Sequence, residues 1–336
     1  MIEEFIKKVS NKINLETAEI EQAVSFIAEG RVSEKEIADF LSALSRKKET
    51  AAEITGAALA LRRYVKRVNI DRDIVLDTCG TGGDQKHTFN ISTVSAFVVA
   101  GAGITVAKHG NRSVSSLCGS GDILEAFGVN IHASVEVVEK CLNEIGIGFL
   151  FAPILHPAFA YVQPVRKVLK MRTIFNVMGP LINPAYPTHQ LIGVFNEELV
   201  PVIAQVLKNL ELKHAMVACG EGGLDEVTTT GRTFISEMSS GHIKDYVLEP
   251  EKLGLARATF DSIRGGDIDA NKQIASGVLK GMEGPYRDIV LLNAGCSVYI
   301  TGRANTIKEG MQIAAESIDS GSAIKKMNKL IEYTNS

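Results

Sequence analysis

The sequence of 336 residues has few cysteines, no long apolar run and no excess of positive charge. Its five cysteines form no C-x-x-C pair, which argues against a disulfide framework or a zinc site and favours a reducing compartment, by default the cytoplasm. No apolar stretch is long enough to span a bilayer, and acidic Glu3 and Glu4 argue against a usual signal peptide. The formal net charge of −3 offers no global attraction to nucleic acid or to an anionic membrane, so any anion must be bound by a local group of residues.

Repeats, low-complexity tracts and charge blocks are absent too, and 45% hydrophobic residues are ample for a large core. Residues 1 to about 66 show helical periodicity only, as in Ile2, Phe5, Ile6 and Val9. From residue 74 onward, short apolar runs typical of strands alternate with helical segments. The runs are residues 74–76, 104–107, 147–151, 191–194, 215–218 and 233–235, while 289–292 is ambiguous between strand and helix. The alternation predicts a large α/β domain, with a central mostly parallel sheet flanked by helices, beside a small all-helical domain.

Helical patterns at residues 157–169 and 173–179 interrupt the series of strands, and we expect this excursion to pack back on the helical N-terminus. We therefore predict a discontinuous small α domain of residues 1–70 and about 166–186. The large α/β domain would comprise residues 71–165 and about 187–336. Pro180, Pro184 and Pro187 indicate a crossing segment between the domains and a candidate hinge.

The first glycine-rich loop, residues 77–84 (DTCGTGGD), follows the first apolar run. Glycines let main-chain N–H groups approach an anion, so the loop is a candidate phosphate site. It is not a dinucleotide fingerprint, because the third glycine position falls on Gln85, and it has no Walker lysine-serine pair. Short polar residues follow where the next helix should begin, namely Thr88, Asn90, Ser92 and Thr93. Their side chains could cap the helix or bind phosphate or Mg²⁺, and the glycine turn alone is equally consistent with a tight connection.

A second loop, residues 108–116 (KHGNRSVSS), follows the run at 104–107. Lys108 and Arg112 lie where ligands usually bind in an α/β sheet, and two cations there imply an anion. The alternative is a solvated basic turn. The glycine-serine composition that continues to Gly121 is typical of a lid that a ligand orders.

A third loop, residues 220–226 (GEGGLDE), carries the adjacent carboxylates Asp225 and Glu226. Oxygen ligands of this kind suit Mg²⁺, which bridges a few carboxylates to substrate phosphates. The alternative is a turn with a solvated acidic pair. Arg166 lies on a predicted helix whose opposite face is Val162, Val165, Val168 and Leu169. In isolation, this pattern favours a solvated helix face over a binding role for Arg166.

Together these segments resemble the anthranilate phosphoribosyltransferases of tryptophan biosynthesis over essentially the whole chain. The resemblance is carried by residues 80–84, 90–93, 108–112 and the Asp225-Glu226 pair. It implies a nucleoside phosphorylase-like fold, with a small α domain and a large α/β domain, and a homodimer formed through the α domain. It also implies transfer of a phosphoribosyl group from 5-phosphoribosyl 1-diphosphate to anthranilate, with Mg²⁺ and with release of diphosphate.

Carried over position by position, the resemblance implies a metal site at Ser92, Asp225 and Glu226 and catalytic roles for Lys108, His109 and Arg166. Arg166 would bind the carboxylate of the aromatic acid, although the residues around Arg166 by themselves favour a solvated helix face. The implied substrate-binding residues are Gly80, Gly82, Gly83, Asp84, Thr88, Asn90, Ile91, Ser92, Thr93, Lys108, Asn111, Ser115, Ser116, Ser120, His156 and Arg166.

The implied reaction needs no covalent nucleophile, because stabilising the leaving group and aligning the acceptor suffice. His109 is the only titratable candidate for a general base beside the acceptor. Loss of the amine proton to water after the attack explains the reaction equally well. Two other functions stay open. A pyrimidine nucleoside phosphorylase would share the architecture without needing the acidic pair. A non-catalytic relative could bind nucleic acid through a basic groove, against which the acidic pI of about 6.2 argues.

Overall fold

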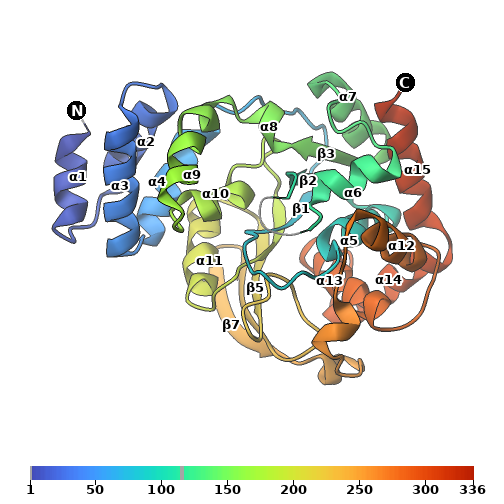
Figure 1. The fold of residues 1–336 in the computed structure, drawn as a ribbon. Coiled ribbons are helices and arrows are strands. Elements are labelled where there is room, and N and C mark those ends of the chain that lie inside the picture. Colours follow the sequence, from blue (N-terminus) through green and yellow to red (C-terminus); the bar gives the residue numbers. More distant parts are fainter. Residues whose placement is uncertain (1, 114–116) are drawn as a thin grey trace.

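The computed structural model describes residues 2–113 and 117–336. A helical N-terminal part lies beside a larger part built on one seven-stranded sheet (Figure 1). The predicted fold class, a small all-helical domain with a large α/β domain, is therefore confirmed. Across these two described stretches, no helix combines the length and the apolar character that crossing a membrane requires.

The N-terminal part consists of helices joined by short connections. They are α1 (Glu3–Ser10), α2 (Thr17–Ala28), α3 (Glu34–Lys47) and α4 (Ala51–Arg62). Ser33 caps α3 and Thr50 caps α4, each in a capping box with the glutamate three residues later. The apolar faces of these helices, including Phe40 and Leu44, are buried against one another.

The sheet has the strand order β3-β2-β1-β4-β5-β6-β7. Its strands are β1 (Val75–Gly80), β2 (Thr105–Gly110), β3 (Ile147–Phe151), β4 (His189–Gly193), β5 (His214–Gly220), β6 (Thr233–Ser239) and β7 (His242–Leu248). The pairs among β1 to β5 are parallel, and β6 and β7 are antiparallel. Each predicted run falls on one of β1 to β6. Several strands extend further than predicted, so residues 77–80 and 108–110 belong to strands and not to the loops.

Helices cover both faces of the sheet, because alternate strand residues point to opposite sides. Leu191 belongs to a core with α5 (Ile91–Gly101) and the C-terminal helices, whereas Ile192 belongs to a core with α11 (Leu199–Asn209) and the N-terminal helices. The ambiguous segment 289–292 is helical, within α13 (Pro285–Ile300). The helices of the first core are α5 (Ile91–Gly101), α6 (Ser120–Phe127), α12 (Ile268–Leu279), α13 (Pro285–Ile300), α14 (Ile307–Asp319) and α15 (Ser322–Thr334). Two further helices of the large part are α7 (Val135–Lys140) and α11 (Leu199–Asn209).

A central excursion of the chain packs on the N-terminal helices. It comprises α8 (Ala152–Leu155), the 3₁₀ turn η2 (Pro157–Tyr161), α9 (Gln163–Leu169) and α10 (Phe175–Leu181). In Figure 1, α9 and α10 lie beside α4, and η2, α9 and α10 contact α2, α3 and α4 respectively. Buried apolar contacts with these helices already begin at Ala158, before the expected boundary near residue 166.

Candidate active site

The strand order reverses between β1 and β4, because β2 and β3 lie on one side of β1 and β4 to β7 on the other. Ligands of open α/β sheets bind at the carboxyl ends of strands beside such a reversal. The ends of β1 and β2, the loops after β1, β2 and β5 and the first residues after Asn90 carry most of the sequence-predicted site residues to this edge. Gly80 and Gly193, the last residues of β1 and β4, pair with each other at its centre.

The loop after β1 has an unusual backbone. Gly82 and Gly83 have φ of +68° and +78°, and the non-glycine residues Gln85 and His87 also have positive φ, +58° and +55°. Successive main-chain N–H groups in such conformations form concave anion-binding sites. Thr81 N–H donates to Gly193 O, and Gly82 N–H donates to Asp225 Oδ2 at 2.7 Å. No acceptor in the described part of the chain binds the Asp84 N–H group.

Asp225 lies directly over the ends of β1 and β4, which explains why both strands end in glycine. A Cβ on Gly193 would lie 1.5 Å from the Asp225 carbonyl oxygen, and one on Gly80 would lie 2.3 Å from Asp225 Oδ2. Burial and the nearby carboxylates of Asp84 and Glu226 raise the pKa of Asp225. Burial also raises the pKa of Glu226, to about 8. The positive charge of Lys108 opposes this rise in the pKa of Glu226.

Three carboxylates thus approach one another, although the described residues contain no group of three or more His, Cys, Asp or Glu arranged to hold a metal by themselves. Asp84 Oδ2 is buried and has no hydrogen-bond partner within that part of the chain. Mg²⁺ usually needs only one or two carboxylates and takes its other ligands from water and substrate phosphates. The donor set of Ser92, Asp225 and Glu226 fits that pattern.

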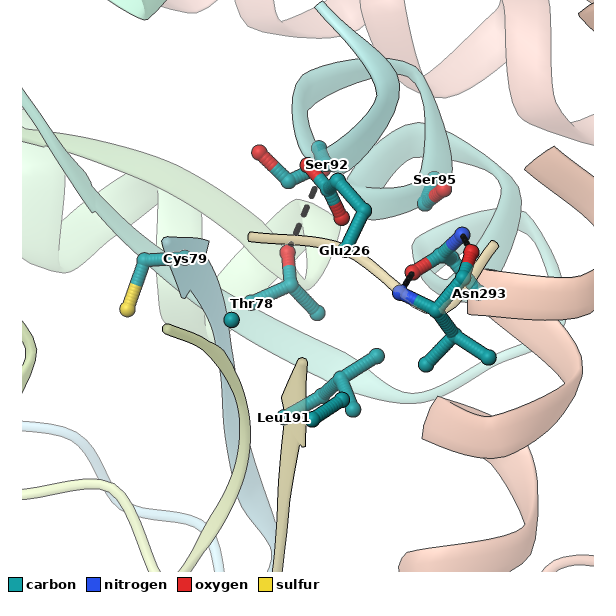
Figure 2. A pocket seen from close by; sticks show the side chains of 10 residues that line it. Thr78, Cys79, Ser92, Ser95, Leu191, Glu226 and Asn293 are labelled. Atoms are coloured by element: carbon teal, nitrogen blue, oxygen red, sulfur yellow. Dashed lines mark hydrogen bonds between the residues drawn. The ribbon is translucent and has the colours of Figure 1, made fainter. Parts of the chain in front are cut away.

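Lys108 lies beneath this edge with its side chain buried. Its Nζ donates to Thr78 O at 2.6 Å and to Ser92 Oγ at 3.2 Å. Burial lowers the pKa of Lys108, while the charges of Asp77 and Glu226 oppose that shift. Figure 2 shows Ser92 and Glu226 close together above Thr78, and all three residues line one small pocket. The positive charge of Lys108 can compensate both the buried carboxylates and an anionic ligand.

The start of α5 presents some predicted residues to the site and buries others. Asn90 is the N-cap of this helix, so the alternative that Ser92 or Thr93 caps it is wrong. Asn90 Nδ2 donates to Cys118 O, and Asn90 Oδ1 is buried with no described partner. Ile91 and Thr93 are buried in the packing of α5, and Thr88 forms an isolated β-bridge with Arg264.

His109 and His156 form a buried pair at the end of β2. His109 Nδ1 lies 3.0 Å from Gly179 O, and the two Nε2 atoms lie 2.9 Å apart. The carbonyl can only accept, so His109 carries its proton on Nδ1 and its Nε2 accepts from the Nε2–H group of His156. Burial lowers the pKa of both rings, that of His156 to about 2. Both imidazoles are therefore neutral at physiological pH.

Acid should destabilise the protein through His156. Its folded-state pKa of about 2 lies below its ordinary value of 6.5. Below pH 6.5 the unfolded chain therefore binds a proton that the folded protein does not, and the free energy of unfolding falls as the pH falls. Between about pH 6.5 and pH 4.5, we expect the free energy of unfolding of the wild type to fall more steeply than that of His156→Gln, by up to about 1.4 kcal/mol per pH unit. Urea titrations of both proteins measure the two slopes, and equal slopes would contradict the prediction.

Arg166 lies on α9 with its guanidinium half-buried, and burial lowers its pKa. No carboxylate of the described chain lies within ion-pair distance of it. An unpaired, partly desolvated guanidinium is a suitable partner for an anionic ligand. The predicted opposite face of this helix is partly wrong, because Val162 and Val165 are buried but Val168 is 80% exposed.

The loop after β2 is organised differently from the sequence-based expectation. Arg112 does not offer its charge to a ligand, because its two Nη atoms bind Glu125 at 2.8 and 2.9 Å and one also binds Asp122. Asn111 O accepts from Ser120 Oγ and from Gly121 N–H, which brings Asn111 and Ser120 together. The predicted Ser115 and Ser116 lie outside the described residues.

The sequence interpretation gave no individual role to two residues of the site. Asp77 is fully buried, and its Oδ1 accepts from His109 N–H, so it fixes the strand backbone that carries the histidine. Arg172 donates from Nη2 to Gly83 O at 2.7 Å and thereby touches the first glycine loop. Asp77 stands at the start of the predicted first glycine-rich loop, and Arg172 stands in a basic cluster at the end of the predicted helix of Arg166, but neither pattern indicated a specific contact.

Comparison with known proteins identifies the same two parts of the chain. The helical bundle domain of a glycosyl transferase family matches residues 3–65, and its a/b domain matches residues 72–324. The chain is 46% identical to an anthranilate phosphoribosyltransferase of Symbiobacterium thermophilum, over 98% of this chain and 97% of the relative. It is 48% identical to one of Ruminiclostridium cellulolyticum, over 100% and 98%.

Solved structures show the same likeness. The anthranilate phosphoribosyltransferase of Thermus thermophilus matches with a TM-score of 0.94 and 39% identity, covering 98% of this chain and 99% of that one. The enzyme of Saccharomyces cerevisiae in complex with PRPP and Mg matches with a TM-score of 0.91 and 28% identity, covering 99% and 98%. On the full-length identity and the shared fold, this chain belongs to the anthranilate phosphoribosyltransferase family.

Proposed function

We propose that this protein transfers the 5-phosphoribosyl group of 5-phosphoribosyl 1-diphosphate to the amino group of anthranilate in tryptophan biosynthesis. The amine nitrogen forms a bond to C1 of the ribose, the bond from C1 to the diphosphate oxygen breaks, and the amine loses a proton. The observation that carries the proposal is the site at the strand-order reversal, where buried carboxylates and Lys108 face a loop with anion-binding backbone geometry.

The donor's phosphates would bind to the loop after β1 and to the start of α5. Gly80, Gly82, Gly83 and Asp84 supply the concave backbone, and Asn90 and Ser92 supply polar side chains beside it. Lys108 would stabilise charge that grows on the departing diphosphate. For Ile91 and Thr93, whose side chains are buried, only the main chain is available for such contacts.

Mg²⁺ would be held by Ser92, Asp225 and Glu226, with the unpartnered Asp84 Oδ2 nearby. When bound, the ion supplies positive charge that neutralises the diphosphate. The Saccharomyces cerevisiae relative was solved with PRPP and Mg, which supports Mg²⁺ as the ion. The protein's own part is to keep the carboxylates close together at the mouth of the glycine loop.

The acceptor would lie between the two domains, with its carboxylate bound by Arg166 and its ring near Gly80, His109, Asn111 and His156. The unpaired guanidinium of Arg166 favours this role. A related Saccharomyces cerevisiae structure contains 4-fluoroanthranilate, a substituted form of the proposed acceptor.

His109 is better suited to position the acceptor than to act as a base, because its Nε2 already accepts from His156. We expect His109→Ala to lower turnover modestly, by much less than the roughly 10⁴-fold upper range of general acid–base contributions. Steady-state kinetics with both substrates at saturation measure this. A loss beyond that range would contradict the prediction and restore His109 as the base.

The proposal is tested by following anthranilate fluorescence in a mixture of the protein, anthranilate, 5-phosphoribosyl 1-diphosphate and Mg²⁺, with a chelator as control. Loss of fluorescence that needs all three components is the expected result. Phosphorolysis of a pyrimidine nucleoside without Mg²⁺ would instead favour the phosphorylase alternative. A salt-sensitive mobility shift with single-stranded DNA would favour a nucleic-acid-binding relative.

We further propose a cytoplasmic homodimer formed through the helical domain. Large exposed apolar side chains on the helical elements and the turns beside them support such a contact. They are Ile13, Tyr161, Val168 and Met171. All five cysteines are free thiols, consistent with a reducing compartment. Sedimentation showing only monomer at micromolar concentration would remove the dimer.

A further inference from the structure

Arg172 joins the helical domain to the glycine loop of the large domain. It follows α9 just beyond Lys170, whose φ of +48° reverses the chain at the end of that helix. Its carbonyl oxygen accepts from Ser45 Oγ of α3 at 2.9 Å. Its guanidinium donates to Gly83 O at 2.7 Å and lies 3.5 Å from the centroid of the Phe195 ring, just after β4. One residue therefore contacts α3, the glycine loop and the segment after β4.

The contact at Gly83 determines where the next N–H group points. The Gly83–Asp84 peptide is planar and trans, so its C=O and N–H groups point in opposite directions. Arg172 holds the C=O outward, and the Asp84 N–H, which donates to no described acceptor, is turned to the other side. The loop has positive φ at Gly82, Gly83 and Gln85, so this anchor selects one of several conformations open to it.

We propose that Arg172 is a positioning residue that fixes the glycine loop in its phosphate-binding conformation and links it to the helical domain. The inference rests on the proposed function, because the ligand of the loop is the diphosphate donor. Arg166 lies earlier on the same segment, which therefore carries both the arginine proposed for the acceptor and the arginine that anchors the donor loop.

The guanidinium group is specifically required in this account. Its planar fork can donate to Gly83 O while its face stacks on Phe195, and a lysine ammonium cannot do both. Arg172→Lys should therefore hold the glycine loop in position only in part. Phe195→Leu should also weaken the positioning of the loop, although the hydrogen bond from Arg172 to Gly83 O stays possible. The exposed ion pair between Lys48 and Glu198 is the matched control, because it also joins the helical part to the large domain but forms no hydrogen bond or ion pair with a described residue of the glycine loop.

The test is calorimetric titration of 5-phosphoribosyl 1-diphosphate with Mg²⁺ into wild type, Arg172→Ala, Arg172→Lys and Lys48→Ala. We expect Arg172→Ala to weaken binding about tenfold, in line with the loss of one charge-assisted hydrogen bond, Arg172→Lys to be intermediate, and Lys48→Ala to match wild type. Because Arg172 is exposed, the thermal midpoint should change little. Wild-type affinity in Arg172→Ala, or an equal loss in Lys48→Ala, would overturn the proposal.

Hydrogen exchange of the ligand-free proteins separates this inference from the proposed function. Amides of the glycine loop should exchange faster in Arg172→Ala than in wild type and Lys48→Ala, whatever the ligand proves to be. If the wild type binds no 5-phosphoribosyl 1-diphosphate but exchange still rises in Arg172→Ala, the proposed function fails and the positioning of the loop stands. Unchanged exchange in Arg172→Ala would overturn the positioning role.

Discussion

Replacing Asp225 by asparagine is expected to lower kcat/KM by at least about 10²-fold, the range found when one charge-stabilising group is removed from an active site. Asp225 is buried over Gly80 and Gly193 and lies beside the carboxylates of Asp84 and Glu226. Asparagine keeps the shape and can still accept from Gly82 N–H, so the change removes charge with little disturbance of the loop. Activity measured as a function of Mg²⁺ concentration should show weaker or absent saturation.

Loss of activity must be separated from loss of folding. Without metal, the buried carboxylates repel one another, so Asp225→Asn should be at least as stable as wild type in chelator. Stabilisation of the wild type by Mg²⁺ with 5-phosphoribosyl 1-diphosphate should be lost in the variant. Glu221→Gln is the matched control, because Glu221 lies on the same loop but is exposed and paired with Arg232, and its activity should be near wild type. A fully active Asp225→Asn protein would remove the metal assignment.

The fold was largely predictable because its strongest signals are local. Buried parallel strands are continuous apolar runs. In the amphipathic helices of the N-terminus, apolar residues recur every three to four positions. The strand β7 was missed because it is an edge strand whose exposed positions carry His242, Lys244 and Asp245, which hides the apolar pattern. The segment 289–292 was ambiguous because α13 is buried on most sides and therefore lacks a polar face.

The site was predictable only as far as its residues follow strands. Asp225, Lys108 and the glycines meet because the carboxyl ends of neighbouring parallel strands meet. Contacts between distant segments gave no signal: Arg172 reaches Gly83 across 89 positions of the sequence, and His156 reaches His109 across 47. Arg112 was misinterpreted for the same reason, because its carboxylate partner Glu125 comes from the following helix. Residue type and spacing therefore indicate which charges are present, but the tertiary structure decides which of them remain available to a ligand.

Lys108→Met is the second variant with a large expected effect, and it should affect both activity and stability. The Nζ atom donates to Thr78 O and Ser92 Oγ, and its charge compensates Asp77 and Glu226. Methionine has a similar length but no charge, so it leaves buried carboxylates uncompensated. Removing one partner of a buried charge pair costs about 3–5 kcal/mol of the free energy of unfolding. Without this cation near the diphosphate, kcat/KM should also fall by about 10²-fold or more.

A second buried lysine separates the two effects. Lys47 in the helical domain donates to Glu53 at 2.8 Å, and the two side chains are 4% and 0% exposed. Lys47→Met should lower the free energy of unfolding by a similar amount, because it too leaves a buried carboxylate uncompensated. At a temperature where both variants remain folded, Lys47→Met should keep wild-type kcat/KM and Lys108→Met should not. Equal activities would mean that Lys108 only supports the fold and that the charge of the diphosphate is stabilised by other groups.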